Sequence, residues 1–188
     1  MSVCIFPGTF NPIHKGHIKM AEFVLDKYNF DKIIFIPAYL PPHKEISKDL
    51  AQHRFKMVEL AIAKNPRFEL SDIEYKSDST SYSLITVKKV IEQYKIESRL
   101  NFIIGTDTLI KLNTWYKADE LKELVHFIVF PRKGVNQDFS ELRKQGWDFE
   151  ITDMDFVEIS STEIRAGECS DTDKLVEEYI KNHGLYKS

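Results

Sequence analysis

Short apolar runs alternate along this chain with segments whose apolar residues recur every three or four positions. The run at 33–36 is apolar throughout and ends at Pro37, which is typical of a strand buried on both faces. We expect strands at residues 3–6, 33–36, 67–75, 100–104, 127–130 and 156–159. We expect helices at 18–28, 51–63 and 84–94, a short one after Gly105, one opened by Ser160-Ser161-Thr162, and a last one with Leu175, Val176, Tyr179 and Ile180 on one face.

This alternation predicts an α/β fold with a doubly wound, mostly parallel, Rossmann-like sheet covered by helices on both faces. The 188 residues suit one sizeable core, and no repeat or composition break divides them, so we expect a single domain over 1–188. Such sheets bind ligands at the carboxyl ends of their strands. The segments to inspect are therefore 7–17, 37–44, 105–107, 131–134 and 160–165.

Charge and cysteine content narrow the class of protein. A formal net charge of −3 gives no reason to expect nucleic acid or an anionic membrane as a partner. Cys4 and Cys169 lie far apart without metal-like spacing or a disulfide framework, and Cys4 is expected to be a small buried core residue. No segment resembles a membrane span or a signal peptide, so a cytoplasmic location is expected. The oligomeric state stays open, a homo-oligomer included.

The chemistry of the chain begins at its first strand. A strand that breaks at Gly8-Thr9 and reopens as a helix is a phosphate-binding layout, because a helix start offers free N–H groups and a positive dipole end. His14 and His17 are three residues apart and project from roughly one face of that helix start. The G-x-x-x-x-G-K-[ST] and G-x-G-x-x-G fingerprints are absent, and no serine lies on a G-x-S-x-G turn.

The other strand ends also carry groups suited to a polyphosphate ligand. Such a ligand needs helix N-termini together with Lys, Arg or His donors, while a carboxylate accepts from ribose hydroxyls. The candidates at these strand ends are Lys44, Gly105, Asp107, Arg132, Ser160, Ser161 and Arg165.

Several of these motifs resemble one enzyme family. The segments GTFNPIHKGH, PPHK, SYS, IIGTDTLIKLNTWY, PRKG, ISSTEIR and VEEYIKNHGLY occur in this order from residue 8 to residue 186. They resemble the bacterial nicotinate-nucleotide adenylyltransferases, members of the H-x-G-H nucleotidyltransferase superfamily. The chain departs from the usual family pattern at Pro7, Asn11, Ser83 and Lys133. These departures affect subsites more than the reaction.

The resemblance implies transfer of the adenylyl group of ATP to nicotinate mononucleotide, with Mg²⁺ accompanying ATP. It implies phosphate contacts by His14, His17 and Arg165. It implies that the ATP site also includes Gly8, Thr9, Phe10, Gly16, Gly105, Asp107, Arg132, Ser160 and Ser161. It implies that the mononucleotide meets Lys44, Ser83, Trp115 and Tyr116, with Trp115 stacking on the pyridine ring.

Other interpretations stay open from the sequence. A histidine pair at helical spacing is more often a solvated face, Trp115 could be a core aromatic, and Lys44 could be a solvated loop lysine. A related enzyme could adenylylate nicotinamide mononucleotide or pantetheine phosphate. A catalytically silent nucleotide-binding regulator is the alternative from another class. It would bind ATP without releasing pyrophosphate.

Overall fold

The computed structural model describes residues 1–42, 44–77, 80–132, 134, 138–154, 159–168 and 170–187. Within these residues, one sheet of six parallel strands has the order β3-β2-β1-β4-β5-β6. The strands are β1 (Val3–Gly8), β2 (Lys32–Pro37), β3 (Phe68–Leu70), β4 (Leu100–Gly105), β5 (Val125–Phe130) and β6 (Phe149–Ile151). This order confirms the predicted doubly wound Rossmann-like sheet, whose direction of winding reverses between β1 and β4.

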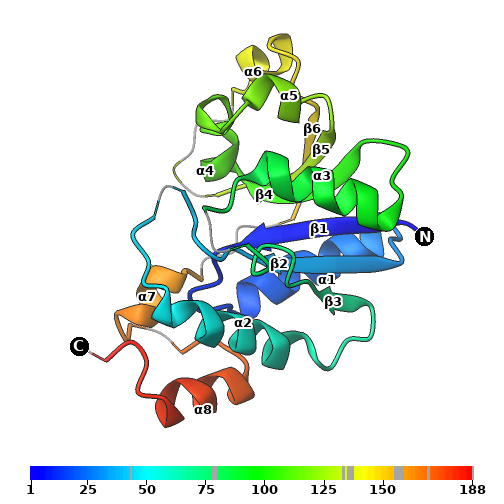
Figure 1. Ribbon diagram of the computed structural model, residues 1–188. Coiled ribbons are helices and arrows are strands. Elements are labelled where there is room, and N and C mark those ends of the chain that lie inside the picture. The colour runs from blue at the N-terminus through cyan, green and yellow to red at the C-terminus, as the bar shows by residue number, and fades with distance from the viewer. Residues whose placement is uncertain are drawn as a thin grey trace.

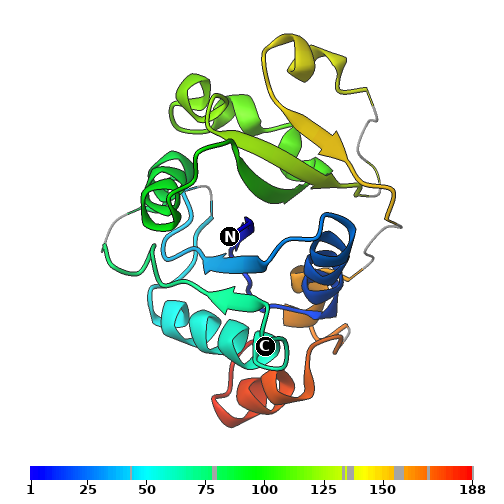
Figure 2. The same ribbon diagram turned by 90° about the vertical axis from the view of Figure 1, so that its right-hand side faces the viewer.

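Helices cover both faces of the sheet. Figure 1 shows α3 in front of the strands and α1 behind them, and Figure 2 shows the same two helices on opposite sides. The helices are α1 (Lys15–Lys27), α2 (Asp49–Ile62), α3 (Ser83–Tyr94), α4 (Thr106–Leu109), α5 (Ala118–Leu121), α6 (Ser140–Lys144), α7 (Ser161–Arg165) and α8 (Lys174–Asn182), with a 3₁₀ turn η1 at Leu112–Thr114.

Successive side chains of a strand point to opposite faces of the sheet, so the core is divided into two layers. On β1, Val3 and Ile5 face the layer that α3 covers, whereas Cys4 and Phe6 face the layer that α1, α2 and α8 cover. Cys4 is fully buried, as expected, and burial raises the pKa of its thiol. The alternation therefore anchors β1 from both sides and sets the direction in which its carboxyl end points.

The two halves of the sheet separate toward the carboxyl ends of the central strands. β1 pairs with β2 along its whole length, from Val3–Lys32 to Gly8–Pro37. It pairs with β4 at Cys4–Asn101 and Ile5–Phe102. The last residues of β1 and β4 are thus free to line an opening between the half-sheets.

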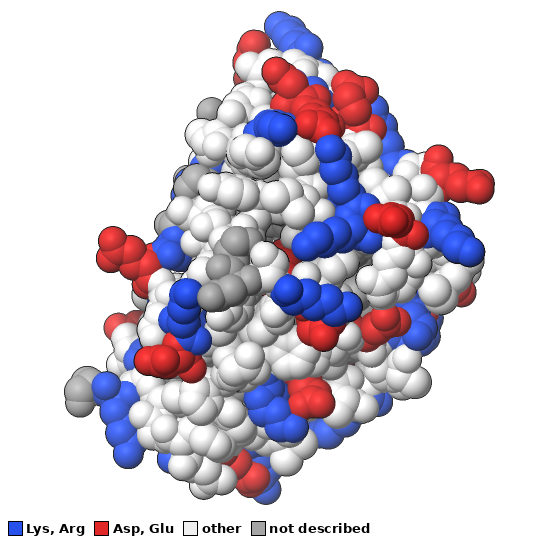
Figure 3. Space-filling view, viewed as in Figure 1, with Lys and Arg blue, Asp and Glu red and all other residues white. Residues whose placement is uncertain are grey.

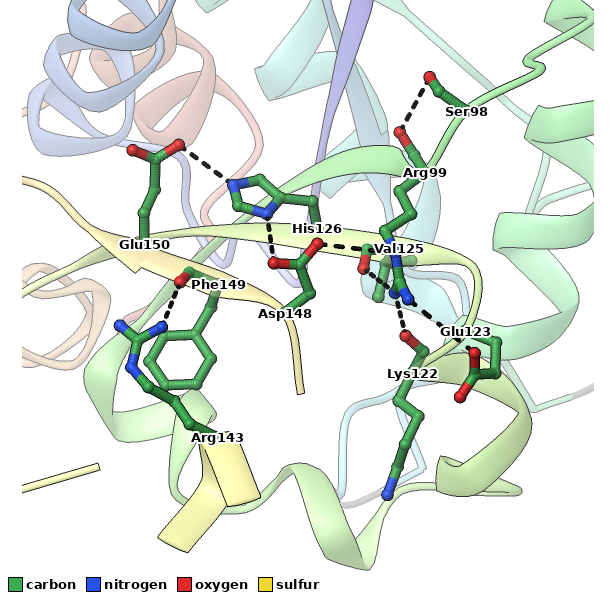
Figure 4. A network of polar contacts seen from close by, with 10 residues as sticks. All are labelled: Ser98, Arg99, Lys122, Glu123, Val125, His126, Arg143, Asp148, Phe149 and Glu150. Atoms are coloured by element: carbon green, nitrogen blue, oxygen red, sulfur yellow. Dashed lines mark hydrogen bonds and ion pairs between the residues drawn. The ribbon is translucent and has the colours of Figure 1, made fainter. Parts of the chain in front are cut away.

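Polar contacts secure the opposite, amino-terminal end of the outer strands (Figure 4). His126 on β5 lies between two carboxylates, with Nδ1 3.2 Å from Asp148 Oδ1 and Nε2 3.1 Å from Glu150 Oε1. Arg99 donates to the Val125 carbonyl at 3.2 Å and lies 3.6 Å from Asp148 Oδ2. These contacts join β5 to the short edge strand β6.

On the face of the molecule shown in Figure 3, acidic and basic side chains are intermixed.

Some predicted elements differ from the structure. The expected strand at 67–75 is confined to Phe68–Leu70, because the chain turns at 73–76 after Ser71 donates to the Phe35 carbonyl at 2.9 Å. Strand β6 was not predicted, since three residues give too little alternation to recognise. Of the strand expected at 156–159, residues 156–158 lie outside the described residues.

The last helix differs in one detail of its apolar face. Val176 is fully buried and Tyr179 and Ile180 pack against the core, whereas Leu175 is 42% exposed, so the prediction that all four share one apolar face was wrong for Leu175. Consecutive helical residues project about 100° apart, and only one of them can point directly at the core. Among the described residues, no helix is long and apolar enough to cross a lipid bilayer.

Candidate active site

A cavity of about 840 Å³ lies at the carboxyl ends of the strands, where β1 and β4 separate. Its wall includes the ends of both strands, at Phe6–Gly8 and at Phe102–Gly105. This is the topological switch point at which open α/β sheets bind ligands, and the volume suits a nucleotide-sized molecule.

The cavity gathers almost every residue that the sequence singled out. Gly16 is the exception, because it is buried in the first turn of α1 and does not reach the wall. Two motif residues, His43 and Lys133, lie outside the described part of the chain. The predicted residues in the wall are Gly8, Thr9, Phe10, His14, His17, Lys44, Ser83, Gly105, Asp107, Trp115, Tyr116, Arg132, Ser160, Ser161 and Arg165.

The loop at residues 9–12, which joins β1 to the start of α1, forms the floor of one end of the cavity. Three of its four carbonyl groups accept hydrogen bonds from side chains distant in sequence. Arg54 Nη1 donates to the Thr9 carbonyl at 2.9 Å, Arg165 Nη1 to Asn11 at 2.7 Å, and Ser161 Oγ to Pro12 at 2.9 Å. Elements α2 and α7 therefore hold this 9–12 loop in place.

Gly8 is required by the way the 9–12 loop folds back. Phe10 has a φ of 49°, which directs its ring over the end of β1. A Cβ on Gly8 would lie 2.9 Å from Phe10 Cζ, closer than side chains tolerate. The same ring packs edge-on against His17, with centroids 5.0 Å apart. The Phe10 ring thus packs against the histidine pair through His17.

His14 and His17 form a reciprocal cap at the start of α1. The His17 backbone N–H donates to His14 Nδ1 at 3.3 Å, and the His14 backbone N–H donates to His17 Nδ1 at 3.1 Å. The rings stack with centroids 3.6 Å apart. Because each Nδ1 accepts a hydrogen bond, these contacts assign the proton of each neutral ring to Nε2. Both rings are thereby prepared to donate Nε2–H.

Burial and nearby cations keep this pair uncharged. Burial, followed by the positive charge of Arg132, lowers the pKa of His14 from 6.5 to about 4. Burial lowers the pKa of His17 well below 6.5, and the repulsion that its protonated ring would meet from a protonated His14, from Arg132 and from Lys44 lowers it further. Protonation at Nδ1 would also break the reciprocal cap. The pair therefore stays neutral, and its caps stay intact, near pH 7.

The free energy of unfolding should depend on pH through His14. The unfolded chain takes up a proton near pH 6.5 and the folded chain near pH 4. Stability is thus complete above pH 6.5 and falls by about 3 kcal/mol as the pH drops to 4. Urea unfolding at several pH values should show this fall. In His14→Asn, which retains an N-cap acceptor, the fall should be markedly smaller. The same pH dependence in both proteins would contradict the assignment.

Cationic side chains approach the cavity from the loop after β2, from the chain after α4 and from α7. Lys44 is an exposed residue. Its ammonium group is nevertheless partly desolvated, which lowers its pKa, and the positive charge of Arg165 lowers the pKa further. Arg165 is half-buried and uses Nη1 and Nη2 on the Asn11 carbonyl and the Thr162 hydroxyl. A guanidinium carries five N–H donors, so these two contacts leave donor capacity on Arg165 within the described residues. Lys111, which was not predicted, also lines the cavity. These groups make the site suited to a polyanion.

Gly105 allows an acidic group to lie close to the end of β4. A Cβ at this position would lie 2.5 Å from Asp107 Oδ1. The same carboxylate, on an exposed side chain, is 4.0 Å from Nε of the half-buried Arg132. The Asp107 carboxylate thus lines the cavity, where it can accept hydrogen bonds from a ligand. Among the described residues, no group of three or more His, Cys, Asp or Glu side chains is placed to hold a metal ion.

The other end of the cavity is formed by the start of α3 and by the chain after η1. Ser83 is the first residue of α3, whose first turn contains no acidic residue. The Tyr82 ring stacks on Tyr116 with centroids 4.6 Å apart. Trp115 is half-buried, lining the cavity while packing against the core ring of Phe102 at 6.2 Å. It is therefore both a core aromatic and a wall of the site.

Sequence reasoning missed Arg54, which is fully buried beneath the cavity. Besides Thr9, it donates to the carbonyls of Ala38 at 2.6 Å and Tyr39 at 2.9 Å. It therefore links the loop after β1 to the loop after β2. The spacing from Ala51 to Arg54 to Val58 placed it on the inward stripe of α2, and this signal could have revealed it.

Fold and site together define a class of nucleotide-binding α/β enzymes. Residues 5–167 match the family described as cytidylyltransferase-like, and the chain belongs to this family. A solved structure, "Plasmodium falciparum nicotinic acid mononucleotide adenylyltransferase complexed with NaAD", superposes with a TM-score of 0.80. The match covers 98% of this chain and 96% of that one at 21% identity, which shows the shared fold.

Curated relatives narrow the class. A "probable nicotinate-nucleotide adenylyltransferase" of Caldicellulosiruptor saccharolyticus is 38% identical over 198 aligned residues and is covered over 100% of both chains. One of Yersinia pestis is 33% identical, covering 97% of this chain and 94% of the relative. Within the cytidylyltransferase-like enzymes, this chain thus belongs to the nicotinate-nucleotide adenylyltransferases, which confirms the resemblance found in its motifs.

Proposed function

We propose that this enzyme transfers the adenylyl group of ATP to nicotinate mononucleotide, giving nicotinate adenine dinucleotide and pyrophosphate in NAD biosynthesis. The observation that carries the proposal is the single cavity at the β1–β4 switch point. It joins a neutral histidine pair and several cations at one end to an aromatic wall and a helix start at the other. A triphosphate and a pyridine nucleotide fit these two ends. A cytoplasmic location belongs to the same proposal.

The proposed chemistry is an in-line displacement at the α-phosphorus of ATP. The attacking 5′-phosphate is already an anion, so no general base is needed, and catalysis rests on alignment and charge stabilisation. His14 and His17 donate Nε2–H to the ATP phosphates, with His17 nearest the α-phosphate. Arg165, beside Ser160 and Ser161, holds the β- and γ-phosphates. These donors stabilise charge that develops in the transition state.

The remaining groups orient the two substrates. Gly8, Thr9 and Phe10 form the phosphate turn, Gly105 and Asp107 hold adenosine, and Arg132 lines the nucleotide side. Lys44 meets the mononucleotide phosphate. Mg²⁺ bound to ATP would supply charge neutralisation at the phosphates, without a dedicated cage of protein ligands.

Acid rather than amide recognition is part of the proposal. The pyridine carboxylate lies at the start of α3, near the backbone N–H of Ser83 and that of Tyr116. A helix N-terminus favours an anion, and α3 brings no acidic residue into its first turn. A neutral carboxamide gains less from this dipole.

Pyrophosphate release with ATP and Mg²⁺ tests the proposal. We expect the highest kcat/KM with nicotinate mononucleotide, compared with nicotinamide mononucleotide and phosphopantetheine. A higher value for either of the others would reassign the acceptor. ATP binding without release for any acceptor would instead support the nucleotide-binding regulator.

Trp115→Ala should weaken mononucleotide binding far more than ATP binding. Loss of the stacking face is expected to raise KM for nicotinate mononucleotide by roughly 10- to 100-fold while KM for ATP changes little. Trp115→Phe retains a ring and should recover much of the loss. Because Trp115 also packs on Phe102, the variants are compared at a temperature where each is folded. An equal rise in both KM values would make Trp115 a fold residue alone.

A further inference from the structure

The C-terminal segment returns to the active site after α8. Val176 of α8 is fully buried in the core layer that also contains α1 and α2. Beyond α8 the chain continues toward α7, as Figure 1 shows. The Tyr186 hydroxyl there donates a hydrogen bond to Asn11 Oδ1. A residue 175 positions away in sequence thus contacts the 9–12 loop directly.

Asn11 is held by hydrogen bonds to two of its groups. Its backbone carbonyl accepts from Arg165 Nη1 at 2.7 Å, and its side-chain carbonyl accepts from Tyr186. Asn11 is 8% exposed, so solvent offers its amide little replacement. The position of Asn11 therefore sets both the course of the 9–12 loop and the direction of the Arg165 guanidinium. Burial raises the pKa of Tyr186 to about 12, which keeps the hydroxyl protonated as a donor.

We propose that Tyr186 is a positioning residue for the triphosphate end of the active site. Its hydroxyl holds the Asn11 amide, and through it the 9–12 loop and Arg165, in the arrangement that receives the ATP phosphates. The inference rests on the proposed function in taking ATP as the ligand at this end. Tyr186 does not act on the mononucleotide end, which is built from α3 and the chain after η1.

Tyr186→Phe removes the hydroxyl and keeps the ring. Titration with a non-hydrolysable ATP analogue should show binding weakened by about 5- to 10-fold, the effect of leaving a buried amide oxygen unpaired. KM for ATP should rise similarly while KM for nicotinate mononucleotide stays unchanged. Tyr179→Phe is the matched control. Tyr179 is on α8, and its hydroxyl lies 2.8 Å from His53 Nδ1. The Tyr179→Phe protein lacks this hydroxyl and should bind the ATP analogue as the parent does.

A double-mutant cycle with Asn11→Ala tests whether the hydroxyl acts through Asn11. Each single variant should weaken ATP binding, and the double variant should show little further loss. Additive losses, normal ATP affinity in Tyr186→Phe, or equal losses in the two tyrosine variants would overturn the inference. If the parent enzyme binds the ATP analogue but does not use nicotinate mononucleotide, the proposed function fails while the binding cycle still decides this inference.

Discussion

Replacing His17 with alanine is expected to lower kcat by about 10²- to 10³-fold with a modest change in KM. His17 offers an Nε2–H held in place by the reciprocal cap and by the Phe10 ring. A donor aimed at charge that appears only in the transition state affects turnover more than substrate binding. Steady-state rates of pyrophosphate release at saturating ATP and nicotinate mononucleotide measure this loss.

Two further His17 variants separate catalysis from capping. Asparagine places an acceptor near the Nδ1 position and lacks the Nε2 donor, whereas glutamine places an amide N–H near Nε2. His17→Asn should regain thermal stability relative to alanine but not turnover. His17→Gln should regain part of the turnover. Recovery of kcat by asparagine would mean that His17 serves the helix start and not the reaction.

Replacing Arg54 with methionine is expected to reduce the free energy of unfolding by about 3–5 kcal/mol. The fully buried guanidinium donates to three carbonyls, those of Thr9, Ala38 and Tyr39, and methionine would leave all three unpaired. The loops after β1 and β2 would lose the side-chain link between them and keep the backbone hydrogen bond from Ala38 N–H to the Gly8 carbonyl. In the fraction that remains folded, KM for ATP should therefore rise. Chemical denaturation and initial-rate measurements follow the two effects.

Arg67→Met provides the comparison for Arg54. Arg67 donates to one backbone carbonyl, that of Phe30, at the far end of β2 from the cavity. Its replacement should lower stability less and leave KM for ATP unchanged. Arg54→Lys keeps the charge but cannot span three acceptors, so it should recover only part of both properties. Equal effects of the Arg54 and Arg67 methionine variants would show that Arg54 has no particular relation to the site.

Residues such as Gly8, Gly105 and Arg132 could be predicted because parallel strands end at one edge of a sheet. The apolar runs locate those strand ends, and the winding rules bring the residues that follow them together. The histidine pair could be found for the same reason, since β1 leads directly into α1.

The partners of Arg54 and Tyr186 could not be predicted in this way, because they are backbone and amide carbonyls of distant loops, even though the spacing on α2 indicates that Arg54 faces inward. The spacing of apolar residues shows that a side chain faces inward, but it does not show which hydrogen-bond acceptors lie near it. Strand β6 and the short helices α5 and α6 were missed because less than two turns, or three strand residues, carry no measurable period. The equally short helices α4 and α7 were predicted, because Gly105 and the run Ser160-Ser161-Thr162 mark where they begin.

The partners of the 9–12 loop also set the order in which the enzyme can be assembled during synthesis. The loop is synthesised before five of the six strands, whereas Ser161, Arg165 and Tyr186 follow all of them in the chain. Contacts between residues so far apart form late, after the closure entropy of nearly the whole chain has been overcome. A nascent chain that stops short of Tyr186 can form β1, α1 and much of the sheet, yet it lacks the final contact on Asn11. The nucleotide-binding end is thus completed only by residues that are synthesised after every strand of the sheet.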